Sequence, residues 1–183
     1  MTKIKLNKLS KHNENINKIV RESIQQALII LMNQKNFNDI SITELCKKAG
    51  VSRMAFYNNY NSKDDLLKQL IYYHSEFLIN EIGSPFREKT NISWYTKMFE
   101  YAKENHYNLK TIFDAGFKYE YLSTITDIVL HDKDISLEKK YLRVMWTGGI
   151  INTIIYWLES GMKESIDEIA TFCYKNLSVW TNE

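Results

Sequence analysis

The scarcity of helix-breaking residues constrains the fold of this chain more than any other feature of its sequence. Only one proline, Pro85, and six glycines occur among 183 residues. Apolar residues recur at spacings of three and four almost throughout, which places them along one face of an α-helix. The sequence shows no alternating pattern typical of β-strands, no internal repeat and no low-complexity segment. It therefore predicts an all-α fold.

Serine-led segments indicate where the helices begin. Ser41-Ile42-Thr43-Glu44 and Ser165-Ile166-Asp167-Glu168 have the spacing of a capping box. Ser52 and Ser62 are further N-cap candidates, because a serine side chain can accept a hydrogen bond from the first turn. We expect helices over about 16–35, 41–49, 52–59, 63–82, 92–106, 108–115, 117–131, 136–160 and 165–181. The segment GSPFREKTNIS, residues 83–93, is the one plausible break between parts of the chain.

The charge is distributed unevenly along the chain. Residues 1–70 contain twelve Lys/Arg and six Asp/Glu, a net charge of +6, whereas residues 71–183 contain twelve and sixteen, a net charge of −4. A basic end joined to a mildly acidic remainder suggests that the first part meets a polyanion. Chance scatter of charges is the alternative.

Composition disfavours several other classes of protein. No apolar run approaches the length of a membrane span, and no signal peptide is evident. With two cysteines, Cys46 and Cys173, a disulfide framework is not expected, which favours a reduced, cytoplasmic setting. The four histidines are scattered and no glycine-rich phosphate loop is present, so we expect no metal, no cofactor and no enzyme. A catalytic triad assembled only in space stays open as a remote alternative.

Two short predicted helices joined by Ala49-Gly50-Val51-Ser52 have the proportions of a helix-turn-helix. Phe56 and Tyr60 share one face of the second helix and are expected to pack inward. The opposite face carries cationic, amide and phenolic side chains, which suit base edges and phosphates in a DNA groove. The candidate DNA contacts are Ser41, Thr43, Ser52, Arg53, Met54, Ala55, Tyr57, Asn58, Asn59 and Lys63. The alternative is that these residues merely pack a small helical subdomain.

The same residues carry a resemblance to a known family. Ile42-Thr43-Glu44-Leu45, Lys48-Ala49-Gly50-Val51-Ser52 and the run from Phe56 to Leu66 resemble, in order and spacing, the DNA-binding segment of TetR/AcrR-family transcriptional regulators. Asn59 and Tyr60 depart from the histidine and phenylalanine common there. The resemblance implies a helical homodimer that binds double-stranded DNA at a palindromic operator, usually as a repressor that an effector releases. A co-regulator controlled by a protein partner, in place of a small molecule, is the alternative.

On this resemblance, the chain divides into three parts. Residues 1–14 are predicted to form a mobile basic tail, residues 15–62 the DNA-binding head, and residues 63–183 a helical effector and dimerisation body that includes the connecting helix 63–82. The lysines of the tail, at positions 3, 5, 8 and 11, are either solvated or act as an arm on DNA.

The body supplies candidates for a dimer interface and an effector pocket. The helix over 136–160 is apolar almost all round, and the resemblance places the last two long helices at a four-helix dimer interface. The interface candidates are Leu142, Trp146, Gly149, Ile150, Thr153, Ile154, Trp157, Ile169, Phe172 and Cys173. An apolar effector pocket is predicted from the aromatic residues Trp94, Phe99, Phe113, Phe117 and Tyr121. Aromatic residues at helical spacing are, alternatively, plain core.

Overall fold

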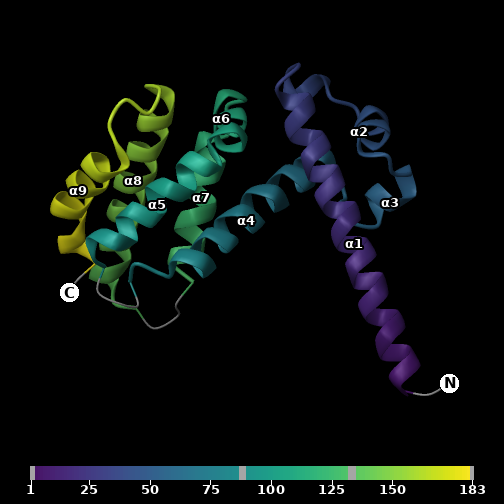
Figure 1. Ribbon diagram of the computed structural model, residues 1–183, viewed down its shortest axis with the longest axis horizontal. Helices are drawn as coiled ribbons and strands as arrows, with labels where there is room; N and C mark the ends of the chain where they lie inside the picture. Colours follow the sequence, from purple (N-terminus) through teal and green to yellow (C-terminus); the bar gives the residue numbers. More distant parts are fainter. Residues whose placement is uncertain (1–2, 87–89, 132–134, 182–183) are drawn as a thin grey trace. The chain divides into compact units, whose positions relative to one another are not determined.

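The structure is a computed structural model that describes residues 3–86, 90–131 and 135–181. These residues form helices and no strand, so the predicted all-α fold is confirmed. The elements are α1 (Lys3–Met32), η1 (Phe37–Asp39), α2 (Ile42–Ala49), α3 (Arg53–Tyr57), α4 (Lys63–Ile82), α5 (Ile92–Glu104), α6 (His106–Asp114), α7 (Lys118–Val129), α8 (Leu137–Glu159), α9 (Ile166–Leu177) and η2 (Ser178–Trp180) (Figure 1). Within the described residues, no helix is long and apolar enough to cross a bilayer.

The first helix starts earlier than the sequence indicated. α1 begins at Lys3, so residues 3–14, predicted to form a mobile tail, are helical in the structure. The physical reason is helix propensity: this lysine- and leucine-containing segment has no proline or glycine to stop a helix. The prediction of a mobile tail followed the usual behaviour of chain termini; the structure gives this segment a helical backbone.

The chain forms two compact units, residues 1–70 and 71–183. Helix α4 contributes its first eight residues to the first unit and the remainder to the second. In the first unit α2 packs against both α1 and α3. Its core contains large side chains with no more than 1% of their surface exposed: Leu28, Leu45, Phe56, Tyr60 and Leu66.

The second unit is built around α5 and α8. α5 packs against α9, α6 and α8, and α7 packs against α8. Two tryptophans of α8 are fully buried and hydrogen-bonded: Trp146 Nε1 donates to the Tyr95 hydroxyl at 3.2 Å, and Trp157 Nε1 donates to the Glu164 carbonyl at 3.0 Å. Because buried indole N–H groups need partners, these two bonds fix the orientation of α8 in the core.

Among the described residues, serine side chains begin five of the helices. The Oγ atoms of Ser41, Ser52, Ser62, Ser136 and Ser165 accept hydrogen bonds from the backbone N–H three residues later. Only Ser165 forms the complete capping box, with Glu168 reaching back to its N–H at 2.8 Å. At the start of α2 the Glu44 carboxylate instead pairs with Lys35 Nζ at 2.7 Å, which lowers the pKa of Glu44.

Candidate nucleic-acid interface and internal cavities

The turn between α2 and α3 is set by two residues. Gly50 has φ of +69°, in the left-handed region that glycine adopts without strain, and caps the end of α2. Ser52 then caps α3 by accepting from Ala55 N–H at 3.1 Å. The short helix α3 is held to the unit by the fully buried Phe56, whose ring lies 5.7 Å from that of Tyr60. The local sequence therefore fixes both the start of α3 and the side that faces inward.

The opposite side of α3 is exposed. Met54 has 74% and Tyr57 49% of its surface exposed, and Arg53 and Asn58 are exposed as well. We call these four residues the recognition face. It presents a cation, a thioether, a phenol and an amide, which together can meet phosphates, base edges and thymine methyl groups.

The remaining residues that were predicted to contact DNA differ in their solvent exposure. Ser41, Thr43 and Ser52 are exposed at the N-terminal ends of α2 and α3, whereas Ala55 is half-buried. The side chain of Asn59 folds back onto its own helix, where Nδ2 donates to the Ala55 carbonyl at 2.8 Å.

The structure corrects the role predicted for Lys63. Its Nζ atom donates to the backbone carbonyls of Phe37, Asn38 (3.2 Å) and Ile40 (2.9 Å), and it lies 4.4 Å from the centre of the Phe37 ring. The ammonium group is thus bound by carbonyl oxygens inside the first unit, which competes with the predicted contact to a phosphate. Burial lowers the pKa of this lysine. Lys63 is a tether between α4 and the η1 segment.

Two further cations lie beside the turn. Lys47 and Lys48, in the last turn of α2, are exposed and precede Gly50 by three and two residues. Neither lysine is among the DNA contacts predicted from the sequence, although Lys48 belongs to the Lys48–Ser52 motif. Their position next to the turn, within the basic part of the chain, was the available signal.

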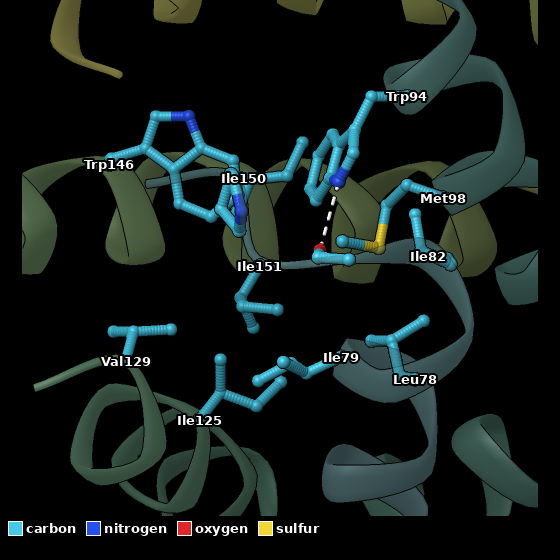
Figure 2. Close-up of a pocket in the computed structure, with 12 residues that line it drawn as sticks. Leu78, Ile79, Ile82, Trp94, Met98, Ile125, Val129, Trp146, Ile150 and Ile151 are labelled. Atoms are coloured by element: carbon cyan, nitrogen blue, oxygen red, sulfur yellow. Dashed lines mark hydrogen bonds between the residues drawn. The ribbon is translucent and has the colours of Figure 1, made fainter. Parts of the chain in front are cut away.

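Two of the cavities that the described residues of the second unit line are called here the first and second chambers. Figure 2 shows the first chamber between α4, α5, α7 and α8, with Trp94 Nε1 donating to the Gly83 carbonyl at 3.0 Å. It comprises about 340 Å³ of empty space, part of it open to solvent. Its lining is Leu78, Ile79, Ile82, Gly83, Pro85, Trp94, Met98, Ile125, Val129, Trp146, Ile150 and Ile151.

The second chamber is smaller and has a polar end. It comprises about 280 Å³, on the same measure, and is lined by Leu78, Met98, Tyr101, Ala102, Leu109, Phe113, Tyr121, Ile151 and Ile154. The Tyr101 hydroxyl lies 3.0 Å from His74 Nδ1. Burial lowers the pKa of His74 and raises the pKa of both Tyr101 and Tyr121, which keeps all three side chains uncharged near neutral pH.

The structure separates the predicted pocket residues. Trp94 lines the first chamber, and Phe113 and Tyr121 line the second. Phe99 lines neither of these chambers: it is fully buried and packs edge-on against Trp157, with ring centres 5.3 Å apart. Phe117 is half-buried at the N-cap of α7 and also lies outside both linings. The aromatic pattern indicated the right region but could not distinguish lining from core.

Half of the predicted dimer-interface residues are buried within the protomer. Trp146, Ile150, Ile154, Trp157 and Cys173 have no more than 5% of their surface exposed, so they cannot contact a second chain. Gly149 packs against Leu177 of its own chain, since a Cβ built there would lie 3.2 Å from that side chain. Leu142, Thr153 and Ile169 are half-buried, and Phe172 is 59% exposed. When a helix has apolar residues on all sides, its sequence does not indicate which side faces the core of the protomer.

Other apolar residues occupy the outer side of α8 and α9. Tyr141, Met145 and Tyr156 follow one face of α8 and are 63%, 52% and 73% exposed. Gly148 lies between them with open space where a Cβ would project. We call Tyr141, Met145, Gly148, Tyr156 and Phe172 the outer face; Figure 1 shows α8 and α9 side by side at the margin of the second unit.

Within the described residues, no cluster of His, Cys, Asp and Glu could hold a metal ion.

Comparison with known protein families decides the identity of the fold and its parts. Residues 24–70 match the family described as bacterial regulatory proteins of the tetR family, and residues 89–178 match a transcriptional regulator C-terminal region of the same family group. The chain belongs to the TetR family. The match to the N-terminal model covers the helix-turn-helix and the recognition face of this TetR-family regulator.

Solved structures share the fold of this TetR-family chain. The dihydroxyacetone kinase operon activator DhaS is 20% identical with a TM-score of 0.60, covering 88% of this chain and 96% of its own. A TetR transcriptional regulator from Streptococcus agalactiae 2603V is 19% identical (TM-score 0.62; 92% and 98%). FadR from Bacillus subtilis, solved with stearoyl-CoA, is 16% identical (TM-score 0.56; 86% and 97%). No curated protein matches the sequence.

Proposed function

We propose that this TetR-family regulator binds a palindromic operator as a homodimer and represses transcription until an effector occupies the chambers of its second unit. The observation that carries the proposal is the placement of α3. Phe56 and Tyr60 anchor its inner side, while Arg53, Met54, Tyr57 and Asn58 face outward. A short helix held in this way can enter a major groove with its N-terminal residues on base edges.

Electrostatics supports the same proposal. Arg53, Lys47 and Lys48 are exposed near the turn, in the part of the chain that carries a net charge of +6. Neutralising phosphates releases counterions, so binding should weaken steeply as salt concentration rises.

Regulation would act through α4, which lines both chambers with Leu78 and belongs at its other end to the first unit. A coupling of about 1–3 kcal/mol changes operator affinity roughly 5- to 150-fold.

Selection of bound fragments from random DNA with the purified protein tests the function. We expect the recovered sequences to share an inverted repeat whose half-sites suit two copies of α3, and binding that weakens with salt. Recovery of no common sequence, together with no binding at low ionic strength, would refute the proposal. Expression from the recovered operator then decides the sign of regulation, because the name of DhaS describes an activator with this fold.

Arg53→Ala should weaken operator binding by about 1–3 kcal/mol and relax discrimination at one base pair, since arginine can bond guanine acceptors. Tyr57→Phe should weaken binding to all sequences alike, because a phenol that donates to a phosphate reads no base. Binding titrations on the operator and on single-base variants measure both effects. Lys97→Ala, an exposed cation on α5, is the control and should change neither quantity. Unchanged affinity and selectivity in Arg53→Ala would mean that the recognition face is misplaced.

The outer face supports the homodimer. Large apolar side chains that are more than half exposed on one helix face are typical of surfaces covered by another chain. A glycine in mid-helix is unfavourable by roughly 0.5–1 kcal/mol relative to alanine. Among the described residues of the protomer, no neighbour requires Gly148 to lack a side chain, whereas the close approach of a second helix would.

Phe172→Glu should therefore shift the protein towards monomer and weaken operator binding, because it places a charge in the proposed apolar interface. Sedimentation velocity over a range of concentrations measures the shift. Phe77→Glu is a matched control, since Phe77 is 55% exposed on α4 in the same unit. A Phe172→Glu protein that remains dimeric would exclude the outer face as the interface.

A further inference from the structure

The two chambers are separated only by side chains. Leu78 of α4, Met98 of α5 and Ile151 of α8 line both of them. In Figure 2 these three side chains project towards one another from three different helices. Met98 is unbranched and has three rotatable side-chain bonds, so it can change shape without movement of a helix. The wall between the chambers can therefore open by side-chain rotation.

The linings favour an uncharged ligand. The first chamber is lined entirely by apolar side chains and Gly83, and the polar groups of the second are two tyrosine hydroxyls. A buried carboxylate or phosphate would find no cation among the described residues of either lining, and burying an unpaired charge is strongly unfavourable. Arg143 lies near the first chamber, but its guanidinium donates to the Val129 carbonyl at 2.6 Å and lies 5.0 Å from the centre of the Phe86 ring.

Two buried hydroxyl groups lie near the shared wall. Thr147 Oγ1 is fully buried and has no hydrogen-bond partner among the described residues. Ser75 Oγ is also fully buried, and its one interaction there is a weak hydrogen bond with Tyr121 that lowers the pKa of that tyrosine. Ser75 precedes Leu78 by three residues on α4, and Thr147 precedes Ile151 by four on α8, so each lies one helical turn from the wall. Ser75 also lies beside the Tyr121 hydroxyl. An unsatisfied buried hydroxyl costs free energy that a ligand oxygen can recover.

We propose that the two chambers form one binding site for an uncharged, elongated molecule with a single hydrogen-bonding oxygen. The apolar part lies in the first chamber, along Ile79, Ile125 and Ile150. The oxygen lies at the end of the second chamber formed by Tyr101 and Tyr121, with Ser75 beside Tyr121. Rotation of the three shared side chains would have to widen the two chambers for such a ligand to enter. This inference rests on the proposed function, because it names the effector class of that regulator.

Calorimetric titration of the full-length protein with n-alkanols, without DNA, tests the site. From 1-butanol to 1-octanol the affinity should rise about three- to fourfold for each added CH₂, because each group leaves water for an apolar chamber. Octanoate at pH 7 should bind at least about tenfold more weakly than 1-octanol, owing to its charge. A rise that stops at 1-pentanol would show two separate chambers and overturn the proposal. Octanoate binding as tightly as octanol, or no alkanol binding, would also overturn it.

Two variants test where the oxygen of the ligand binds. Tyr121→Phe and Ser75→Ala should each lower the affinity for 1-octanol about three- to tenfold, since each removes one hydrogen-bonding group and little volume. Tyr119→Phe, on the same helix but 76% exposed, is the matched control and should bind octanol normally. Unchanged affinity in both chamber variants would overturn the assigned polar end.

Because calorimetry needs no operator, the inference and the proposed function fail separately. A protein that binds its operator but no alkanol refutes the ligand site and leaves the regulator intact. A protein that binds octanol but no DNA refutes the regulatory function. Release of the operator by octanol in the wild type, but not in Tyr121→Phe at the same concentration, would support both.

Discussion

Phe56→Ala should lower the free energy of unfolding of the first unit by about 3–5 kcal/mol, the usual cost of removing a fully buried phenylalanine ring. The ring has none of its surface exposed and packs near those of Tyr57 and Tyr60, at 5.4 and 5.7 Å between ring centres. Domain stabilities are typically about 5–15 kcal/mol, so much of the stability of this small unit would be lost. Hydrogen exchange of the α2 and α3 amides, followed by mass spectrometry, measures the change.

The neighbouring residue provides the control for this experiment. Tyr57→Ala should change the unfolding free energy by less than about 1 kcal/mol, because surface substitutions seldom have larger effects and Tyr57 is 49% exposed. It should nevertheless weaken DNA binding. If Tyr57→Ala destabilised the unit as much as Phe56→Ala, both rings would belong to the core and the recognition face would lose its phenol.

Lys63→Met should destabilise the first unit by about 1.5–3 kcal/mol, the usual contribution of hydrogen bonds to a charged group. Methionine keeps the length of the side chain but cannot donate to the carbonyls of Phe37, Asn38 and Ile40. Urea unfolding measures the loss, and hydrogen exchange should rise first in the segment from Phe37 to Ile40. Lys68→Met, an exposed position on the same helix, should have little effect.

The same variant distinguishes the tether from the role that the sequence suggested. A lysine that contacts phosphate contributes to DNA affinity and to its salt dependence, but little to stability. If Lys63→Met retained wild-type stability and only flattened the salt dependence of binding, the phosphate contact would be correct and the tether wrong.

Local signals were enough to predict most of the fold. Serine caps at Ser41, Ser52 and Ser165 lie where the helices begin, because capping depends on residues only three positions apart. The inward side of α3 also followed from spacing, since Phe56 and Tyr60 fall on one helix face and are both buried. Short-range geometry of this kind needs no knowledge of the tertiary structure.

Contacts between distant residues could not be predicted in this way. The tether joins Lys63 to a carbonyl 26 positions earlier, and no pattern in the sequence marks that carbonyl as an acceptor. The interface prediction on α8 failed at Trp146 and Trp157 because a helix with apolar residues on every side carries no periodic signal of orientation. Burial in the structure separates the two sides and assigns Tyr141 and Tyr156 to the outer one.

The construction of α3 bears on how such a regulator could acquire a new operator. Its beginning depends on Ser52 and its attachment mainly on Phe56, whereas the side chains at the outward positions 53, 54, 57 and 58 are exposed. Substitutions there could accumulate singly during evolution, each giving a folded protein on which selection can act. Duplicated genes could thus diverge in the promoters they control while the rest of the protein is unchanged.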